Sequence, residues 1–230
     1  MHLNILYEDD HIIVINKPAG LTVHPAPGQK SGTLVNGLLA HCENLPGING
    51  KLRPGIVHRL DKDTSGCIVV AKSQESLVNL QLQIKNKIAS RNYIAVVHGV
   101  PEESEGKIIG NIGRHPSNRK KYAVVDDKSG RYACTNWKFI NNFGNYSLIN
   151  FKLDTGRTHQ IRVHCAHINH PIVGDPLYGR CRKLPCNLNG QALHANKLGL
   201  FHPINGKEMI FEAEIPSDIE KLLRIIKKKI

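Results

Sequence analysis

Residues 57–66 read VHRLDKDTSG, and an apolar run, CIVVA, follows directly at 67–71. In an otherwise basic chain, Asp61 stands between Arg59 and Lys62, in a segment that ends in short polar residues and glycine. These residues are typical of a turn, and the β-branched run behind them predicts a buried strand. A turn that leads into a buried strand would hold Asp61 in one place, so the segment bears on both the fold and the site.

Each notable polar residue has a simple structural explanation when taken alone. An isolated Asp61 is best explained as a turn carboxylate that accepts hydrogen bonds from the backbone amides that follow it. Tyr93 is then a strand aromatic with its ring in the core and its hydroxyl at the edge. Arg157 and Arg162 would be ordinary surface cations. Only the combination of these stretches favours a shared site.

The N-terminal half predicts short strands and two helices. Residues 5–18, ILYEDDHIIVINKP, are typical of two strands joined by a turn. A helix is predicted over 33–41, with Ser31 or Thr33 as its cap, and another after Ser73. The apolar face of this second helix is expected to contain Leu77, Leu80, Ile84 and Ile88.

The C-terminal half predicts mostly strands. Residues 92–99 form one, and alternation over 131–153 indicates two more. The glycine-rich segment 106–125 is expected to be irregular and to expose the basic loop RHPSNRKK. Residues 192–215 predict a hairpin with an Asn-Gly turn. The helix caps expected in this half are Gly156–Thr158 and the Ser217–Glu220 capping box.

The order of the predicted elements favours one class of fold. Strands outnumber helices, hairpin signals are frequent, and regular β-α alternation is absent, which favours an α+β fold over a doubly wound one. We predict a single domain over 1–230, with a mainly antiparallel mixed sheet, flanking helices and a central active-site cleft.

Charge indicates the class of partner. The chain has 31 Lys+Arg against 19 Asp+Glu, a formal net charge of +12 and a pI near 9.5. Such an excess favours a polyanionic partner, and nucleic acid is the first candidate. The apolar runs are strand-sized and the first ten residues do not resemble a signal peptide, so we expect a cytoplasmic protein without a membrane partner.

Cysteine and histidine spacing does not favour a metal. The six cysteines are scattered, which predicts free thiols in a cytosolic chain. Cys181 and Cys186 are the closest pair, and no second pair completes a four-ligand zinc site. Four histidines occur at 159, 164, 167 and 170, but the arginines between them disfavour a bound dication. We therefore predict no metal site.

Four segments together are similar to the signature segments of an enzyme family. They are GIVHRLDKDTSG at 55–66, NYIAVVHG at 92–99, LDTGRTHQIRVHCAHINHPIVGDPLYG at 153–179 and ALHANKLGLFHP at 192–203. In order and spacing the chain resembles the RluA/RluD family of RNA pseudouridine synthases, from about Ile5 to Pro216, and its RluD side in particular. The resemblance implies an isomerase, an intramolecular transferase that acts on RNA.

The resemblance also implies roles for individual residues. Asp61 matches the catalytic aspartate of the family, Tyr93 its active-site tyrosine and Arg162 its basic partner. Arg59 matches the arginine that fills the space left by a flipped nucleotide. The further residues expected to bind RNA are Arg114, Arg119, Lys120 and Lys121 of the basic loop, together with Arg157.

The chemistry of the implied reaction suits these residue types. The N-glycosidic bond of uridine must break, the bound uracil must turn, and C5 must rejoin the ribose. Asp61 has to be ionised to attack ribose C1′ or uracil C6, or to act as a base, and an ion pair with Arg162 would favour that form. Tyr93 could stack on the uracil near C5, where a proton is lost. No redox change or external group takes part, so no cofactor is expected.

Several readings of the substrate and activity stay open. Large-subunit ribosomal RNA is the expected substrate, and transfer RNA or dual use is the alternative. A non-catalytic RNA-binding or ribosome-assembly factor, or a hydrolase that uses Asp63 as a second carboxylate, would also fit parts of the pattern. We expect a monomer with no S4-like accessory domain before the catalytic region, and the high charge would offset part of the lost RNA affinity.

Overall fold

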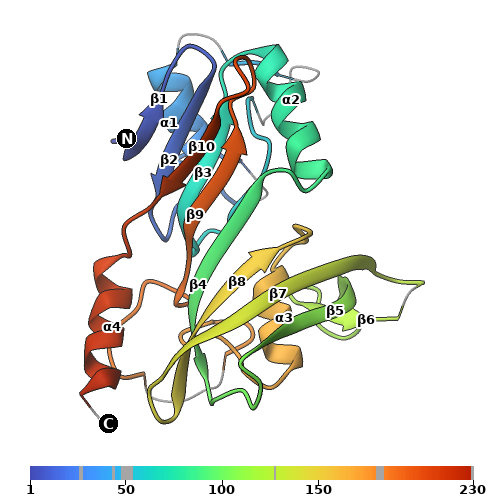
Figure 1. The fold of residues 1–230 in the computed structure, drawn as a ribbon, viewed down its shortest axis with the longest axis vertical. Helices are drawn as coiled ribbons and strands as arrows, with labels where there is room; N and C mark the ends of the chain where they lie inside the picture. The colour runs from blue at the N-terminus through green and yellow to red at the C-terminus, as the bar shows by residue number, and fades with distance from the viewer. Residues whose placement is uncertain (26–27, 43–44, 48–53, 127, 180–183, 229–230) are drawn as a thin grey trace. The chain divides into compact units, whose positions relative to one another are not determined.

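A computed structural model of the chain describes residues 1–25, 28–42, 45–47, 54–126, 128–179 and 184–228. The chain divides into two compact units. Unit 1 contains Met1–Arg91 and Ala195–Glu214, and unit 2 contains Asn92–His194 and Ile215–Ile230. Antiparallel strand pairs and short helices make up both units (Figure 1), which confirms the α+β class.

Unit 1 is built around an antiparallel group of strands. β2 pairs with β3 in a register that runs from Ile12 opposite Ala71 to Lys17 opposite Gly66. The Asp61 segment therefore leads into a strand whose seven residues are all buried, as its sequence indicated. The strands of this unit are β1 (Ile5–Glu8), β2 (Ile12–Lys17), β3 (Ser65–Ala71), most of β9 (Leu193–Phe201) and β10 (Glu208–Glu212).

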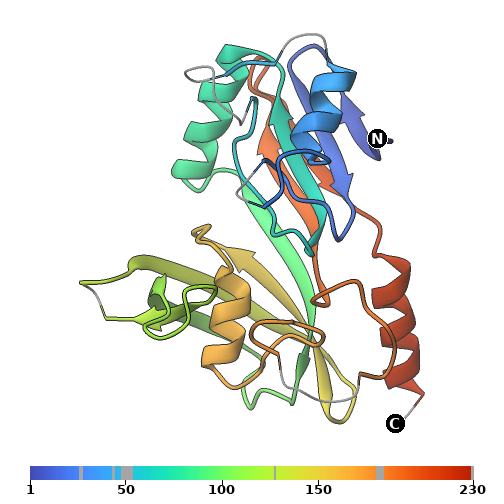
Figure 2. The same ribbon diagram turned by 180° about the vertical axis from the view of Figure 1, so that it is seen from behind.

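Two helices cover these strands because β2 is apolar on both faces. Ile12 and Val14 pack with Leu77 and Leu80 of α2 (Gln74–Lys85) in one core cluster. α1 (Leu34–His41) lies over β1 and β2 (Figures 1 and 2). Both helices begin where the sequence predicted, capped by the side chains of Thr33 and Ser73.

Unit 2 is a second antiparallel group, in the order β4-β8-β7-β5-β6, with α3 (Gln160–His167) packed on β5, β6 and β7 (Figure 2). α4 (Ser217–Lys227) buries Ile219, Leu222 and Ile226. The strands are β4 (Ser90–His98), β5 (Glu105–Arg114), β6 (Tyr122–Val125), β7 (Arg131–Asn142) and β8 (Tyr146–Leu153).

The prediction of an irregular segment over 106–125 is wrong at both ends, because residues 106–114 belong to the ten-residue strand β5 and residues 122–125 form β6. Glycines interrupt the apolar alternation of β5. At these positions, side chains of neighbouring strands fill the space that a larger residue would need. A Cβ on Gly106 would lie 3.0 Å from the Trp137 indole nitrogen, and one on Gly110 would lie 2.8 Å from a Val124 methyl. These glycines therefore serve cross-strand packing in a strand.

Of the remaining local predictions, some are confirmed and others are wrong. The hairpin of β9 and β10 is confirmed, with Gly206 at φ +70° in its turn. α2 ends before Ile88, which is 49% exposed and not part of its apolar face. The expected caps of α3 and α4 are wrong: their N-cap residues are His159 and Pro216, without a side-chain cap bond. Cys181 lies outside the described residues.

No helix in the part of the chain that the structure describes is both long and apolar enough to cross a bilayer.

Replacing Gly66 by Ala should destabilise unit 1 strongly. Gly66 has φ +114°, and an added Cβ would overlap the backbone carbonyl oxygen of Ala195 in β9. We expect a loss of about 2–4 kcal/mol in the free energy of unfolding, measured by urea denaturation. The matched control is Gly32→Ala, where φ is +69° but no atom lies within 4 Å of the new Cβ. Equal losses in the two variants would contradict the overlap.

Candidate active site

Asp61 lies in a tight turn immediately before β3. The Thr64 amide donates to the Asp61 carbonyl oxygen at 3.1 Å, which closes the turn through the backbone. Thr64 and Ser65 are each 2% exposed, whereas Asp61 is half-buried. The carboxylate is thus carried by a short turn anchored to a fully buried strand.

Lys17, the last residue of β2, is buried completely and lies beside this turn. Its Nζ donates to three carbonyl oxygens: those of Pro18 and Leu21 at 2.8 Å each, and that of Lys62 at 3.0 Å. An ammonium group has three donors, so these acceptors saturate it. Lys17 therefore ties the loop after β2 to the residue next to Asp61.

The same lysine places a titrating cation near the Asp61 carboxylate. Burial lowers the pKa of Lys17 to about 7, while the charges of Asp61 and Asp63 oppose that shift. The sequence analysis missed Lys17. A signal was present, because a charged residue at the end of an apolar strand and just before a proline has to find backbone acceptors.

His58 fixes the other end of the turn. The Val69 amide of β3 donates to its Nε2 at 3.1 Å, so this nitrogen acts as an acceptor and the ring is neutral with its proton on Nδ1. The residue is partly exposed, but Nδ1 itself is buried. Burial and the charge of Arg91 lower the pKa of His58 to about 3. His58 therefore serves packing and hydrogen bonding next to the Asp61 turn.

Tyr93 and Arg162 are both buried parts of unit 2. Tyr93 lies in β4 opposite Phe151 of β8 and is 6% exposed. Arg162 lies in α3, and its Nε and Nη2 donate to the two carboxylate oxygens of Asp175 at 2.7 and 2.9 Å. The Asp175 side chain is fully buried, so the surface-cation explanation of Arg162 is wrong.

Asp175 is a further site residue that the sequence analysis missed. Its Oδ1 also accepts from the amides of Leu177 and Tyr178 at 2.9 and 3.0 Å. It therefore orders the loop after it while it orients the guanidinium of Arg162, which lies 5.2 Å from the centre of the Tyr178 ring. The available signal was the aspartate-proline pair in GDPLYG, which is typical of a turn.

His159 connects this loop to the start of α3. It has a left-handed backbone, with φ +58°, and its Nδ1 lies 2.9 Å from the Tyr178 hydroxyl. Its ring meets those of Tyr122 and Tyr178 edge-on, at 5.5 and 5.7 Å. The neighbouring histidines also have protein partners, since His164 bonds to Thr135 and His170 to the His98 carbonyl.

The residues expected to bind RNA are largely exposed. Arg59 is exposed in unit 1. Arg114, Arg119 and Lys120 are exposed in unit 2, and Arg114 stacks 4.7 Å from the Tyr122 ring centre and donates to the Arg119 carbonyl. Half-buried residues complete the set: Lys121, and Arg157, whose Nε donates to the Tyr132 carbonyl at 2.9 Å.

Each unit therefore contains some of the expected site residues. Unit 1 contains Asp61 and Arg59, and unit 2 contains Tyr93, Arg162 and the basic loop. The ion pair expected between Asp61 and Arg162 joins residues of different units and stays a prediction.

The neutral state of His58 should make stability depend on pH. In the unfolded chain its pKa is near 6.5, so the unfolded state binds the extra proton between about pH 6.5 and 3, and stability falls as pH drops through this window. At pH 4.5 this loss relative to pH 7 is on the order of 2 kcal/mol. Urea unfolding of His58→Gln should show a correspondingly smaller loss than the wild type, whereas the exposed-site control His2→Gln should behave as wild type. Equal losses in all three proteins would contradict the assignment.

A family model and two curated relatives that the chain resembles all belong to one enzyme family. Residues 11–167 match the model described as RNA pseudouridylate synthase. An uncharacterized RNA pseudouridine synthase of Synechocystis sp. is 52% identical over 229 residues, covering 99% of this chain and 70% of the relative. The ribosomal large subunit pseudouridine synthase D of Zymomonas mobilis is 46% identical over 231 residues, covering 97% and 73%.

A solved structure supports the fold. The human RNA pseudouridylate synthase domain containing 4 protein superimposes with a TM-score of 0.75, at 24% identity, over 97% of this chain and 93% of that one. The matched family region contains Asp61, Tyr93 and Arg162. The chain belongs to the RNA pseudouridine synthase family, as its four signature segments indicated, and is an isomerase.

Proposed function

We propose that this enzyme converts uridine to pseudouridine in large-subunit ribosomal RNA and that Asp61 is its reacting carboxylate. The observation that carries the proposal is the position of Asp61, in a turn that Lys17 and the Thr64 amide hold against β3. The substrate follows from relatives named ribosomal large subunit pseudouridine synthase D, which are 45–48% identical to this chain.

The surroundings of Asp61 suit a nucleophile or base that works in its ionised form. Lys17 interacts electrostatically with it, and an opposite charge favours the ionised form of a carboxylate. In the proposed reaction Asp61 attacks ribose C1′ or uracil C6, or takes a proton from the sugar. The turn restricts its backbone, so little reorganisation is needed when the substrate binds.

Tyr93 and Arg162 are the proposed partners from unit 2. Burial limits the motion of the Tyr93 ring, which suits stacking on a uracil that has to turn while bound. Asp175 uses two of the five N–H donors of Arg162 and orients its plane. The proposed ion pair of Arg162 with Asp61 would use another of these donors and favour the carboxylate form. The central cleft that would bring these residues together stays a prediction.

RNA binding is proposed to use the exposed cations. A net charge of +12 supplies affinity through phosphate contacts without reading the sequence. The loop that follows Arg114 is ordered by the Arg114 bond to the Arg119 carbonyl and by the amide of Lys121, which donates to the Asn118 carbonyl at 2.9 Å. Arg59 is proposed to fill the space left by the flipped uridine, because its planar guanidinium can stack on neighbouring bases.

Loss of the Asp61 carboxylate should abolish turnover. We expect Asp61→Asn to release at least about 1000-fold less tritium from ribosomal RNA labelled at uracil C5, because a neutral amide is neither nucleophile nor base. Asp63→Asn is the matched control, since Asp63 is also half-buried in this turn, and it should retain most of the activity. Comparable losses in both variants would overturn the assignment of Asp61 as the single reacting carboxylate. Release from transfer RNA alone would overturn the ribosomal substrate.

Removal of charge from the basic loop should reduce the salt dependence of RNA binding. In Arg119→Gln/Lys120→Gln, two phosphate contacts are lost, so the slope of log K against log salt should fall by about 1.4–1.8. The control Lys85→Gln/Lys207→Gln removes two exposed cations elsewhere and should leave the slope unchanged. Filter binding with a large-subunit RNA fragment at several salt concentrations measures both. A slope equal to wild type in the loop variant would exclude the loop from the interface.

A further inference from the structure

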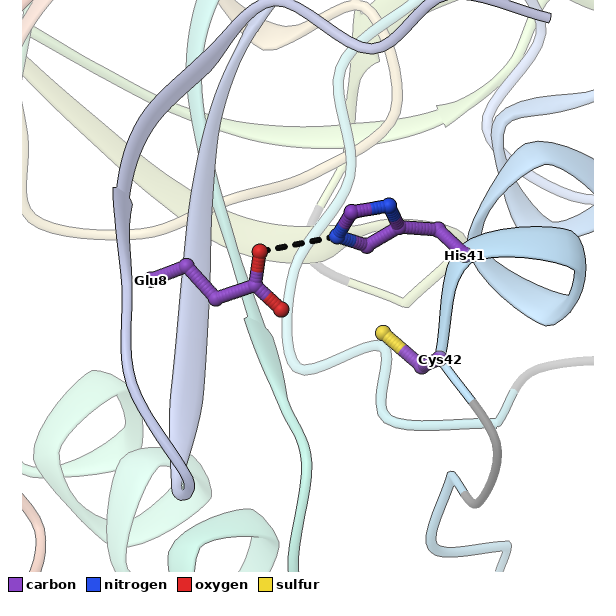
Figure 3. A group of neighbouring side chains, drawn as sticks. All are labelled: Glu8, His41 and Cys42. Carbon is purple, nitrogen blue, oxygen red and sulfur yellow. Dashed lines mark hydrogen bonds and ion pairs between the residues drawn. The ribbon is translucent and has the colours of Figure 1, made fainter.

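Three different metal-ligating groups meet in unit 1, at the junction of β1 and α1. The carboxylate of Glu8, the Nε2 of His41 and the sulfur of Cys42 all lie within 4.8 Å of one another, as Figure 3 shows. Glu8 ends β1, His41 ends α1, and Cys42 is the C-cap residue of that helix. None of them takes part in the proposed reaction.

Local structure directs two consecutive residues to one point. Cys42 leaves the helix with an extended backbone, at φ −102° and ψ 128°, and its amide still donates to the Leu38 carbonyl at 2.8 Å. Inside a helix, neighbouring side chains point about 100° apart around the axis. Cys42 has left the helix, so its side chain can point to the same side as that of His41. The His41 ring and the Cys42 sulfur both face the Glu8 carboxylate (Figure 3).

Lys72 holds the carboxylate of Glu8 from the other side. Its Nζ donates to Glu8 Oε1 at 2.8 Å and to the Asp9 carbonyl at 2.6 Å, while Glu8 Oε2 lies 2.8 Å from His41 Nε2. Oε1 is thus engaged by Lys72, and Oε2 by the His41 ring. Outer partners of this kind orient metal-binding carboxylates in proteins.

We propose that Glu8, His41 and Cys42 bind a Zn²⁺ ion through Oε2, Nε2 and the thiolate, with water as the fourth ligand. Nitrogen, sulfur and a carboxylate oxygen are the ligands that zinc prefers, whereas magnesium and calcium select oxygen alone. A tetrahedral zinc site separates its ligand atoms by about 3.3–3.8 Å. The most widely spaced of the three atoms, which all lie within 4.8 Å of one another, therefore have to close by up to about 1 Å, whereas Glu8 Oε2 and His41 Nε2, now 2.8 Å apart, have to open by about 0.5 Å. Glu8 and His41 are exposed, so rotation of their side chains can supply such a shift.

Charge and protons balance in this site. Zn²⁺ displaces one proton from the Cys42 thiol, which leaves to solvent. His41 binds in its neutral form with its proton on Nδ1, so the proton that Nε2 donates to Glu8 Oε2 is given up to solvent and Nδ1 keeps or takes up one proton. The thiolate and the Glu8 carboxylate then neutralise the two charges of the ion. Cys42 is 7% exposed, and a metal stabilises the thiolate form of such a buried cysteine. The bound ion would link the end of α1 to β1, so it would stabilise unit 1.

Direct zinc binding tests the site. The reduced, EDTA-treated full chain is titrated with ZnCl₂ against a chromophoric zinc chelator. We expect one equivalent bound by the wild type, with at least about tenfold weaker binding in Cys42→Ser and in His41→Gln. Cys186→Ser changes another thiol, in unit 2, and should bind as wild type. Cys42→Ser leaves the ion pairs among Glu8, His41 and Lys72 in place, so it separates a zinc site from a surface salt-bridge cluster.

A second readout identifies the thiolate ligand. Co²⁺ bound by the wild type and by Cys186→Ser should give a sulfur-to-cobalt charge-transfer band, and Cys42→Ser should lack it. Zinc affinity and Co²⁺ spectra that do not change in Cys42→Ser would overturn the proposal, as would a wild type that binds no equivalent. Tritium release should persist in Cys42→Ser, so failure of this site is distinguishable from failure of the proposed RNA activity.

Discussion

The buried ammonium of Lys17 is the interaction on which the Asp61 turn depends. A charge inside a protein is tolerated only when hydrogen bonds replace its water, and three backbone carbonyls do so here. One of them belongs to Lys62, so the loop that carries the candidate nucleophile cannot move without breaking a bond to a buried cation. Because Lys17 is the last residue of the buried strand β2, this bond fixes the Asp61 turn relative to the core.

Unit 2 also contains a buried cation, but a carboxylate rather than backbone carbonyls neutralises it. Arg162 is buried in α3, and Asp175 neutralises it through two hydrogen bonds while accepting two more from the loop that follows. Removing either partner would leave an unpaired charge in the interior, a defect worth about 3–5 kcal/mol. The ion pair therefore ties the helix and the following loop to the guanidinium.

Backbone space matters as much as charge. Gly66 allows β3 and β9 to approach closely just behind the Asp61 turn, and Gly106 and Gly110 make room for side chains of the neighbouring strands. These glycines carry no functional side chain. They set the distances between the strands that carry the side chains.

Local patterns were enough to predict much of the fold. The strand behind Asp61, the caps Thr33 and Ser73 and the hairpin turn at Gly206 depend on residues near in sequence, so their signals could be read directly. The strand β5 was misread because its glycines are explained by Trp137 and Val124, which lie in other strands. Local pattern and local propensity carry no information about such distant neighbours.

The sequence by itself determined the family, through four spaced segments, and named Asp61, Tyr93 and Arg162 as candidates. Only the tertiary structure decided which groups hold them: Lys17 and His58 beside Asp61, and Asp175 beside Arg162. Lys17 lies 45 positions before Lys62, and Asp175 lies 13 positions after Arg162. The physical reason is that the cost of burying a charge is met by whichever acceptors the fold brings near, and sequence spacing does not specify them.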